Sequence, residues 1–200
     1  MIEALARELY ATSALEALAV VLGVIYLLLI LKRNRLGWVA GAGSSAIYVY
    51  LSARARLPMQ SALQMFYVAM SAYGFRSWVR HEKEADSVVT TWPARAHLGA
   101  WLAILALSAA SSRWLAAETG AAWPFLDSVT TWASLVATWL VVRMKLENWL
   151  YWIAIDLVLT YLCAAQKLAF VGVLYATYLG ISVVGFVAWL KTYRRQARAR

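Results

Sequence analysis

The chain has 200 residues, of which 63% are hydrophobic and only 14% charged, and its formal net charge is +9. Soluble domains of this length carry about a quarter charged residues, so the composition excludes an ordinary soluble protein and predicts an integral membrane protein. The lone Cys163 excludes an internal disulfide, and His81 and His97 do not share a helical face, so we expect neither a metal site nor a cofactor.

Apolar windows of about 20 residues, long enough to cross a bilayer as a helix, recur along the whole chain. They predict an all-α integral membrane fold and a single transmembrane domain over residues 1–200, with no room for a separate globular domain. The seven predicted transmembrane helices cover residues 12–31, 37–53, 59–79, 97–115, 124–142, 148–165 and 168–190.

The basic residues lie mainly between these helices and in the C-terminal tail. With seven spans, 13 of them fall on the side of the odd-numbered connections and the tail, against five on the other side. The larger set is Lys32, Arg33, Arg35, Arg80, Lys83, Arg95, Arg143, Lys145, Lys191, Arg194, Arg195, Arg198 and Arg200, and the smaller set is Arg7, Arg54, Arg56, Arg113 and Lys167. Because cytoplasmic loops are enriched in Lys and Arg, we predict an outside N-terminus, a cytoplasmic C-terminus and contact with lipid rather than nucleic acid.

The chain also repeats itself at an offset of 111 residues. Residues 38–78 align without a gap on residues 149–189, with 11 identities in 41 positions. The identities in the first copy are Trp38, Tyr50, Leu51, Ala53, Leu57, Leu63, Tyr67, Ser71, Gly74, Phe75 and Trp78. The offset pairs a first repeat of three helices (about 12–79) with a second (about 124–190) and leaves 97–115 as a linker helix. Two parallel repeats in a 3+1+3 order are a recurring transporter design with the substrate between the repeats, although a duplicated bundle without transport is the alternative.

The segment "ENWLYWIAID" carries polar and aromatic residues into an apolar helix. Trp149, Trp152 and Asp156 recur at i, i+3 and i+7, so they share one helical face. Ionisable groups inside a membrane are rare and usually functional, and aromatic faces beside a carboxylate suit a flat cationic ring. Trp149 could instead anchor the helix at the membrane interface, and Asn148 could only cap it. We expect the ligand, or water in its cavity, to compensate for the burial of Asp156.

Gln64 and Tyr175 occupy equivalent positions in the two repeats, so we expect them to face each other across a central path and to bind opposite ends of one ligand. Other polar side chains lie one or two turns further along the same helices: Tyr67, Ser71, Tyr178 and Ser182. Hydrogen bonds between the helices are the competing role for each of them. The sequence contains no glycine-rich nucleotide loop, nucleophile elbow or zinc-binding helix motif, which makes an enzyme the weaker class.

Two stretches carry a family resemblance. "PFLDSVTTWASLVATWLVVRMKLENWLYWIAIDLVLTYL", followed by "LYATYLGISVVGFVAWLK", resembles the second half of the PnuC family of bacterial vitamin transporters, and "ENWLYW" with the Asp after it is the most specific mark. In the first half, "LQMFYVAMSAYGFRSW" is similar to the family's Gln-containing third helix. The resemblance covers residues 12–191.

The resemblance implies a SWEET-like fold, a homotrimer in the bacterial inner membrane, and facilitated uptake of nicotinamide riboside that a separate kinase traps by phosphorylation. It places the substrate at or beside Gln64, Asn148, Trp149, Trp152, Asp156, Tyr175 and Tyr178, with Tyr67 and Ser71 nearby. Ser71 stands where nicotinamide riboside transporters of the family carry Asn, so thiamine and riboflavin remain open as substrates. A non-transporting membrane scaffold or sensor and an ion-coupled symporter remain as alternatives.

Overall fold

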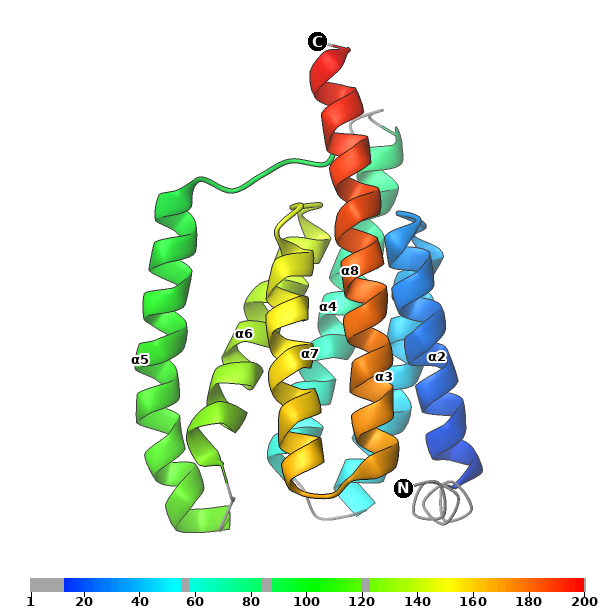
Figure 1. Cartoon of the computed structure of the whole chain (residues 1–200). Coiled ribbons are helices and arrows are strands. Elements are labelled where there is room, and N and C mark those ends of the chain that lie inside the picture. Colours follow the sequence, from blue (N-terminus) through cyan, green and yellow to red (C-terminus); the bar gives the residue numbers. More distant parts are fainter. Residues whose placement is uncertain (1–12, 55–57, 84–87, 120–122, 200) are drawn as a thin grey trace.

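The computed structural model of the chain describes residues 13–54, 58–83, 88–119 and 123–199. These residues form seven α-helices and, in place of any sheet, one isolated bridge between Thr90 and Lys145 (Figure 1). The helices are α2 (Ala14–Leu31), α3 (Leu36–Arg54), α4 (Pro58–Lys83), α5 (Ala94–Thr119), α6 (Pro124–Val142), α7 (Asn148–Ala165) and α8 (Ala169–Arg198). The prediction of an all-helical protein is confirmed. The predicted first helical residue, 12, lies outside the described residues, as do Arg7, Arg56 and Arg200.

Three helices extend beyond their predicted ends. α4 continues to Lys83 rather than 79, α5 covers Ala94–Thr119 rather than 97–115, and α8 continues to Arg198 rather than 190. The extensions are rich in polar and charged residues, which are good helix formers but lie outside any apolar window. Hydropathy therefore predicted the apolar part of each helix, and it did not predict the polar turns that extend α4, α5 and α8 beyond that part.

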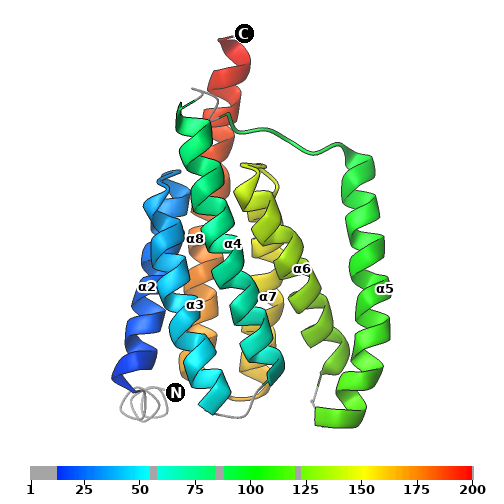
Figure 2. The same cartoon turned by 180° about the vertical axis from the view of Figure 1, so that it is seen from behind.

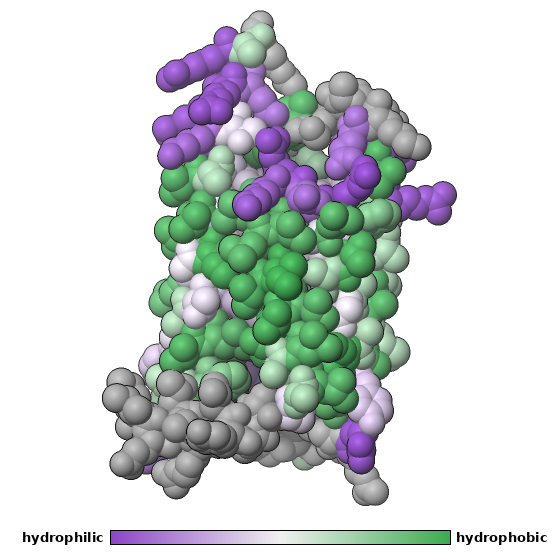
Figure 3. All heavy atoms as spheres, turned by 90° about the vertical axis from the view of Figure 1, so that its right-hand side faces the viewer, coloured by the Kyte–Doolittle hydropathy of each residue, from purple (hydrophilic) through white to green (hydrophobic). Residues whose placement is uncertain are grey.

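Five of these helices are long and apolar enough to cross a membrane: α2, α5, α6, α7 and α8. α3 and α4 do not reach the same apolar average, because α3 carries Gly and Ser and α4 carries Gln and Arg along their lengths. On the face shown in Figure 3, hydrophobic side chains form a broad band across the bundle, and hydrophilic side chains gather at the end that carries the C-terminus. We call this end the C-terminal end.

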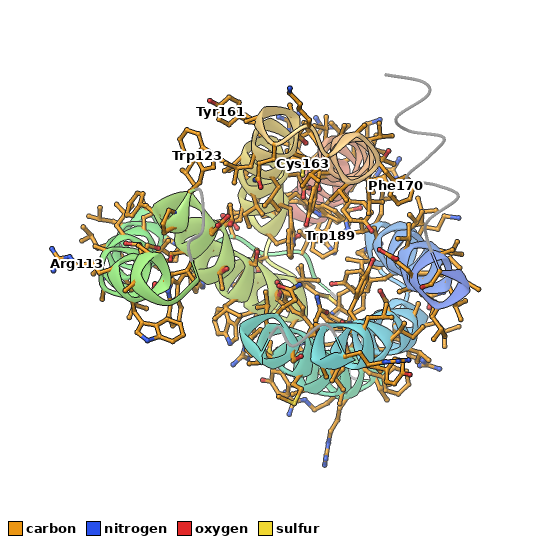
Figure 4. The ribbon with its side chains drawn as sticks, turned by 90° about the horizontal axis from the view of Figure 1, so that it is seen from below. Arg113, Trp123, Tyr161, Cys163, Phe170 and Trp189 are labelled. Carbon is orange, nitrogen blue, oxygen red and sulfur yellow. The ribbon has the colours of Figure 1, made fainter. Side chains whose placement is uncertain are left out.

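Six of the helices form a closed ring. Along the chain, α2 packs on α3 and α3 on α4, while α6 packs on α7 and α7 on α8. Two joints connect these groups of three: α4 contacts α6, and α2 contacts α8. α5 stands outside the ring, where its backbone lies against α6 and its Trp101 stacks on Tyr151 of α7 (Figures 2 and 4). The ring therefore encloses an interior to which α5 contributes no wall.

The turns after α2 and α6 are built alike. Arg33 and Met144, which are 111 positions apart, have positive φ angles of 56° and 51°. In the residues that follow, the amide of Asn34 donates to the carbonyl of Leu29 at 2.9 Å, and the amide of Lys145 donates to that of Leu140 at 2.9 Å. A left-handed residue followed by such a six-residue bond is the Schellman ending of a helix. The repeat seen in the sequence thus extends to the backbone of these turns.

Four tryptophans fill the core of the ring at its C-terminal end. This tryptophan cluster consists of Trp38, Trp78, Trp149 and Trp189, each at most 1% exposed. Trp38 meets Trp78 edge-on at 5.5 Å between ring centroids, and Trp149 meets Trp189 at 5.6 Å. Both are geometries that aromatic pairs prefer. Because 38 and 78 correspond to 149 and 189 at the offset of 111, each half of the chain contributes one such pair.

Candidate functional site

Asp156 is the one acidic or basic side chain that is buried among the described residues. Its side chain is 3% exposed, and Oδ2 accepts a hydrogen bond from the Ser182 hydroxyl on α8 at 3.1 Å. No ion pair joins Asp156 to a basic residue of the described part of the chain. The sequence prediction assigned the compensation to ligand or water, whereas the structure supplies part of it from a neighbouring helix. A carboxylate held by one neutral hydroxyl has no counter-ion among the described residues, so a cationic ligand would supply the missing opposite charge.

Tyr175 and Tyr178 lie on α8 beside this carboxylate. Their rings meet nearly at right angles at 6.2 Å between centroids, and both residues are within electrostatic range of Asp156. Tyr48 of α3 is within the same range of both tyrosines. The hydroxyl oxygen of Tyr178 also approaches α2, since a Cβ added at Gly23 would lie 3.0 Å from it. Two phenols of α8 therefore lie near the carboxylate, and a third, from α3, lies near those two.

The opposite wall of the interior comes from α4 and its neighbours. Tyr67 is within electrostatic range of Tyr175, and its side chain is in hydrogen-bond contact with Ser134 of α6. Ser71, 5% exposed, lies one turn further along α4, where its hydroxyl faces Gly41 of α3. The structure therefore brings Tyr67, Tyr175, Tyr178 and Asp156 together, as the sequence predicted.

Sequence reasoning missed Tyr26, Tyr48 and Ser134 as interior residues. Tyr26 lies in the interior, where it interacts with Tyr67 and packs against Gly41. A tyrosine inside an otherwise apolar membrane helix needs a partner for its hydroxyl, and that pattern was the available signal. The repeat could not reveal these residues, because positions 137 and 159, which correspond to Tyr26 and Tyr48, are Ala and Leu.

The start of α7 lies nearer the C-terminal end. Asn148 is fully buried, and its side-chain amide donates to the carbonyl of Lys145 at 2.6 Å. The residue before it, Glu147, is the helix cap, so the alternative of Asn148 as the cap is wrong. The amide oxygen of Asn148 and the indole N–H of Trp149 are buried without a hydrogen-bond partner among the described residues.

Trp149 and Trp152 differ in their surroundings. Trp149 belongs to the tryptophan cluster and packs against Gly185 and Trp189, which cover its ring. Trp152 is half-buried and lies between the two hydrophobic clusters of the bundle. Of the two, Trp152 therefore has the ring with more free surface. Gln64 is likewise half-buried, one turn before Tyr67 on α4.

Two hollows beside α5 contain none of the nine predicted residues. The larger, about 480 Å³, is lined by Phe66, Met70, Trp92, Ala100, Ala103, Ile104, Leu107, Trp132, Leu135, Val136 and Trp139. It offers almost no polar surface, so it suits hydrocarbon better than a polar vitamin. The smaller, about 250 Å³, is lined by His97, Trp101, Glu147, Leu150 and Tyr151. The polar interior of the ring is therefore the candidate site.

Comparison with known proteins identifies the family. Residues 13–191, nearly the whole chain, match the family described as "Nicotinamide mononucleotide transporter". The chain belongs to this transporter family. The family resemblance seen in the sequence is thereby confirmed, and the protein is a membrane transporter rather than an enzyme.

Relatives within the transporter family have different named substrates. The chain is 27% identical over 198 residues to the nicotinamide riboside transporter PnuC of Neisseria mucosa, covering 92% of this chain and 75% of the relative. It is 28% identical over 185 residues to the riboflavin/roseoflavin transporter RibM of Streptomyces davaonensis, covering 89% and 85%. The crystal structure of the vitamin B3 transporter PnuC superimposes with a TM-score of 0.75 at 25% identity, covering 97% of this chain and 88% of that one.

Proposed function

We propose that this transporter carries nicotinamide riboside into the cell by facilitated diffusion, with a separate kinase trapping the product. The observation that carries the proposal is the buried Asp156, whose carboxylate is bound by Ser182 alone among the described residues and lies near the rings of Tyr175 and Tyr178. Nicotinamide riboside has a cationic ring and several hydroxyls. A buried carboxylate favours the cation, and phenols can bind the hydroxyls.

The nine predicted residues divide into three roles. Trp152 stacks on the ring while Asp156 offsets its charge, and Trp149 supports this wall from the tryptophan cluster. Gln64 and Tyr175 fix the orientation of the ligand from opposite sides. The remaining polar groups bind its hydroxyl and amide groups: Tyr67, Ser71, Asn148 and Tyr178. Support comes from the proximity of Tyr67, Tyr175, Tyr178 and Asp156 and from the buried atoms of Asn148 and Trp149 that have no hydrogen-bond partner among the described residues.

The architecture that we propose is a single domain of seven spans in a SWEET-like 3+1+3 order, with α5 as the linker. The matched turns at Arg33 and Met144, and the equivalent joints α4–α6 and α2–α8, support two parallel repeats. Transport then consists of rocking of one repeat against the other. We place the protein in the bacterial inner membrane as a homotrimer, with the N-terminus outside and the C-terminus in the cytoplasm, which the charge distribution favours. Native mass spectrometry tests the trimer.

Riboflavin is the second candidate substrate. The similarity to RibM favours it, and Ser71 leaves more room than the Asn of nicotinamide riboside transporters. Riboflavin is neutral and wider, however, and makes less use of Asp156. The decisive experiment measures uptake of labelled nicotinamide riboside, thiamine and riboflavin into proteoliposomes, together with thermal shifts of the purified protein. We expect nicotinamide riboside to give the largest shift and flux without an ion gradient. Flux of riboflavin alone would contradict the proposal, and absence of any flux from folded protein would exclude transport of these vitamins.

A further inference from the structure

The tryptophan cluster holds the two halves of the ring together through hydrogen bonds. The indole N–H of Trp78, on α4, donates to the carbonyl of Val142 at the end of α6 at 3.1 Å. The indole N–H of Trp189, on α8, donates to the carbonyl of Leu31 at the end of α2 at 3.1 Å. Each bond crosses one of the two joints between the groups of three helices.

These two bonds are copies of each other. Trp78 and Trp189 are 111 positions apart, and so are Leu31 and Val142. The acceptors are the last carbonyls of α2 and α6, which have no partner inside their own helices. An indole from the other half supplies that partner. Opening either joint at this end therefore leaves a helix-terminal carbonyl and an indole N–H unpaired.

The cluster also fills the ring between Asp156 and the C-terminal end. Trp149 precedes Asp156 on α7 by seven residues, roughly 10 Å of helix rise. Between that carboxylate and the C-terminal end lie four indole rings with at most 1% of their surface exposed. Trp189 lies on the inner side of α8 when the bundle is viewed along its axis (Figure 4).

We propose that Trp78 and Trp189 are gate residues, whose paired indole bonds to Val142 and Leu31 latch the central path shut at the C-terminal end. The proposal rests on the transport function proposed above, because a gate needs a path. Both bonds connect the same two groups of three helices, one at each joint. Moving these groups apart at the C-terminal end therefore breaks both bonds in one step. Trp38 and Trp149 pack against Trp78 and Trp189 but form neither of the two latch hydrogen bonds.

The test replaces each latch tryptophan by Phe, which keeps an aromatic ring and removes the donor. The matched control is Trp132→Phe, because the indole N–H of Trp132 donates to Ser111 of α5 at 3.2 Å and crosses neither joint. A reporter cysteine replaces Ser45, the buried position equivalent to Asp156, in a Cys163→Ala background. A membrane-impermeant maleimide is added from the side of the C-terminus, and the labelling rate is measured.

We expect Trp78→Phe and Trp189→Phe each to raise the labelling rate about three- to tenfold, the shift that loss of one net hydrogen bond gives, and the double variant to exceed either. Trp132→Phe should leave the rate within about twofold, which is the size of a surface change. Unchanged labelling in both latch variants, or an equal rise in the control, would overturn the proposal.

If a phenylalanine variant fails to fold, benzothienylalanine at position 78 replaces the indole N–H by sulfur and keeps the shape of the ring. The same rise in labelling is expected, and no rise would again overturn the latch. Labelling needs no substrate, so its outcome is independent of which vitamin is carried. If the latch variants raise the labelling rate but the protein transports none of the vitamins, the proposed substrate is refuted and the proposed gate is still supported.

Discussion

The Ser182 hydroxyl donates to Asp156 Oδ2 across 3.1 Å, and this bond joins the two helices that carry most of the candidate site. Both side chains are nearly inaccessible to solvent, at 1% and 3%. A carboxylate in such surroundings costs free energy unless something binds it. The bond therefore stabilises the empty transporter, while the remaining carboxylate lone pairs stay available to a ligand.

Replacing Ser182 by Ala should destabilise the protein by about 1–3 kcal/mol, because a buried acceptor loses its donor. Thermal unfolding in detergent measures this as a fall in Tm. Thr177→Ala is the control on the same helix, since its hydroxyl is exposed and donates only to its own helix at Val173. An equal fall in both variants would mean that the Asp156 bond contributes nothing particular.

Asp156→Asn should weaken binding of a cationic vitamin by about tenfold or more and that of a neutral vitamin much less, because only the cation loses an opposite charge. Titration of purified protein with nicotinamide riboside and with riboflavin compares the two. Asp127→Asn, in the first turn of α6, is the control. Equal losses for both ligands would assign Asp156 a purely structural role.

Gly74→Ala and Gly185→Ala should each destabilise the fold by about 1–3 kcal/mol or more, the usual cost of overpacking. A Cβ at Gly74 would lie 2.5 Å from the Trp38 ring, and one at Gly185 would lie 2.6 Å from the Trp149 ring. Gly99→Ala and Gly180→Ala are matched controls, because an added Cβ meets nothing within 4 Å. Retention of the wild-type Tm by the first pair would show that the tryptophan cluster relaxes easily.

Glu147→Ala should lower stability by about 1–3 kcal/mol, whereas Glu82→Ala should change it by less than about 1 kcal/mol. Glu147 Oε1 accepts a hydrogen bond from the amide of Trp92 at 2.9 Å and lies 3.7 Å from His97 Nε2, so its loss leaves a part-buried amide without an acceptor and removes a charge beside His97. Glu82 forms an exposed ion pair with Arg35. The two Tm values, measured side by side, check the difference.

Hydropathy and the 111-residue offset predicted most of the secondary structure, because both depend on properties of single segments. They also identified Asp156 and the tyrosines beside it. They could not predict which side chain of another helix meets Asp156, because that depends on the rotation of α7 and α8 about their axes. α7 is apolar on most of its circumference, so its sequence does not fix that rotation. The burial of Trp149 in the tryptophan cluster escaped prediction for the same reason.

Among the described helices, α5 is attached to only one half of the ring. α5 packs on α6, its Trp101 stacks on Tyr151 of α7, and the connection that leads into it is attached to the same half of the ring. The amide of Val89 donates to Gln196 of α8, and Thr90 pairs with the turn between α6 and α7. In any rigid-body motion of the halves, α5 and residues 89–93 travel with α6–α8. One moving body therefore consists of α2, α3 and α4 alone. The other consists of four helices, α5–α8, together with the connection at residues 89–93.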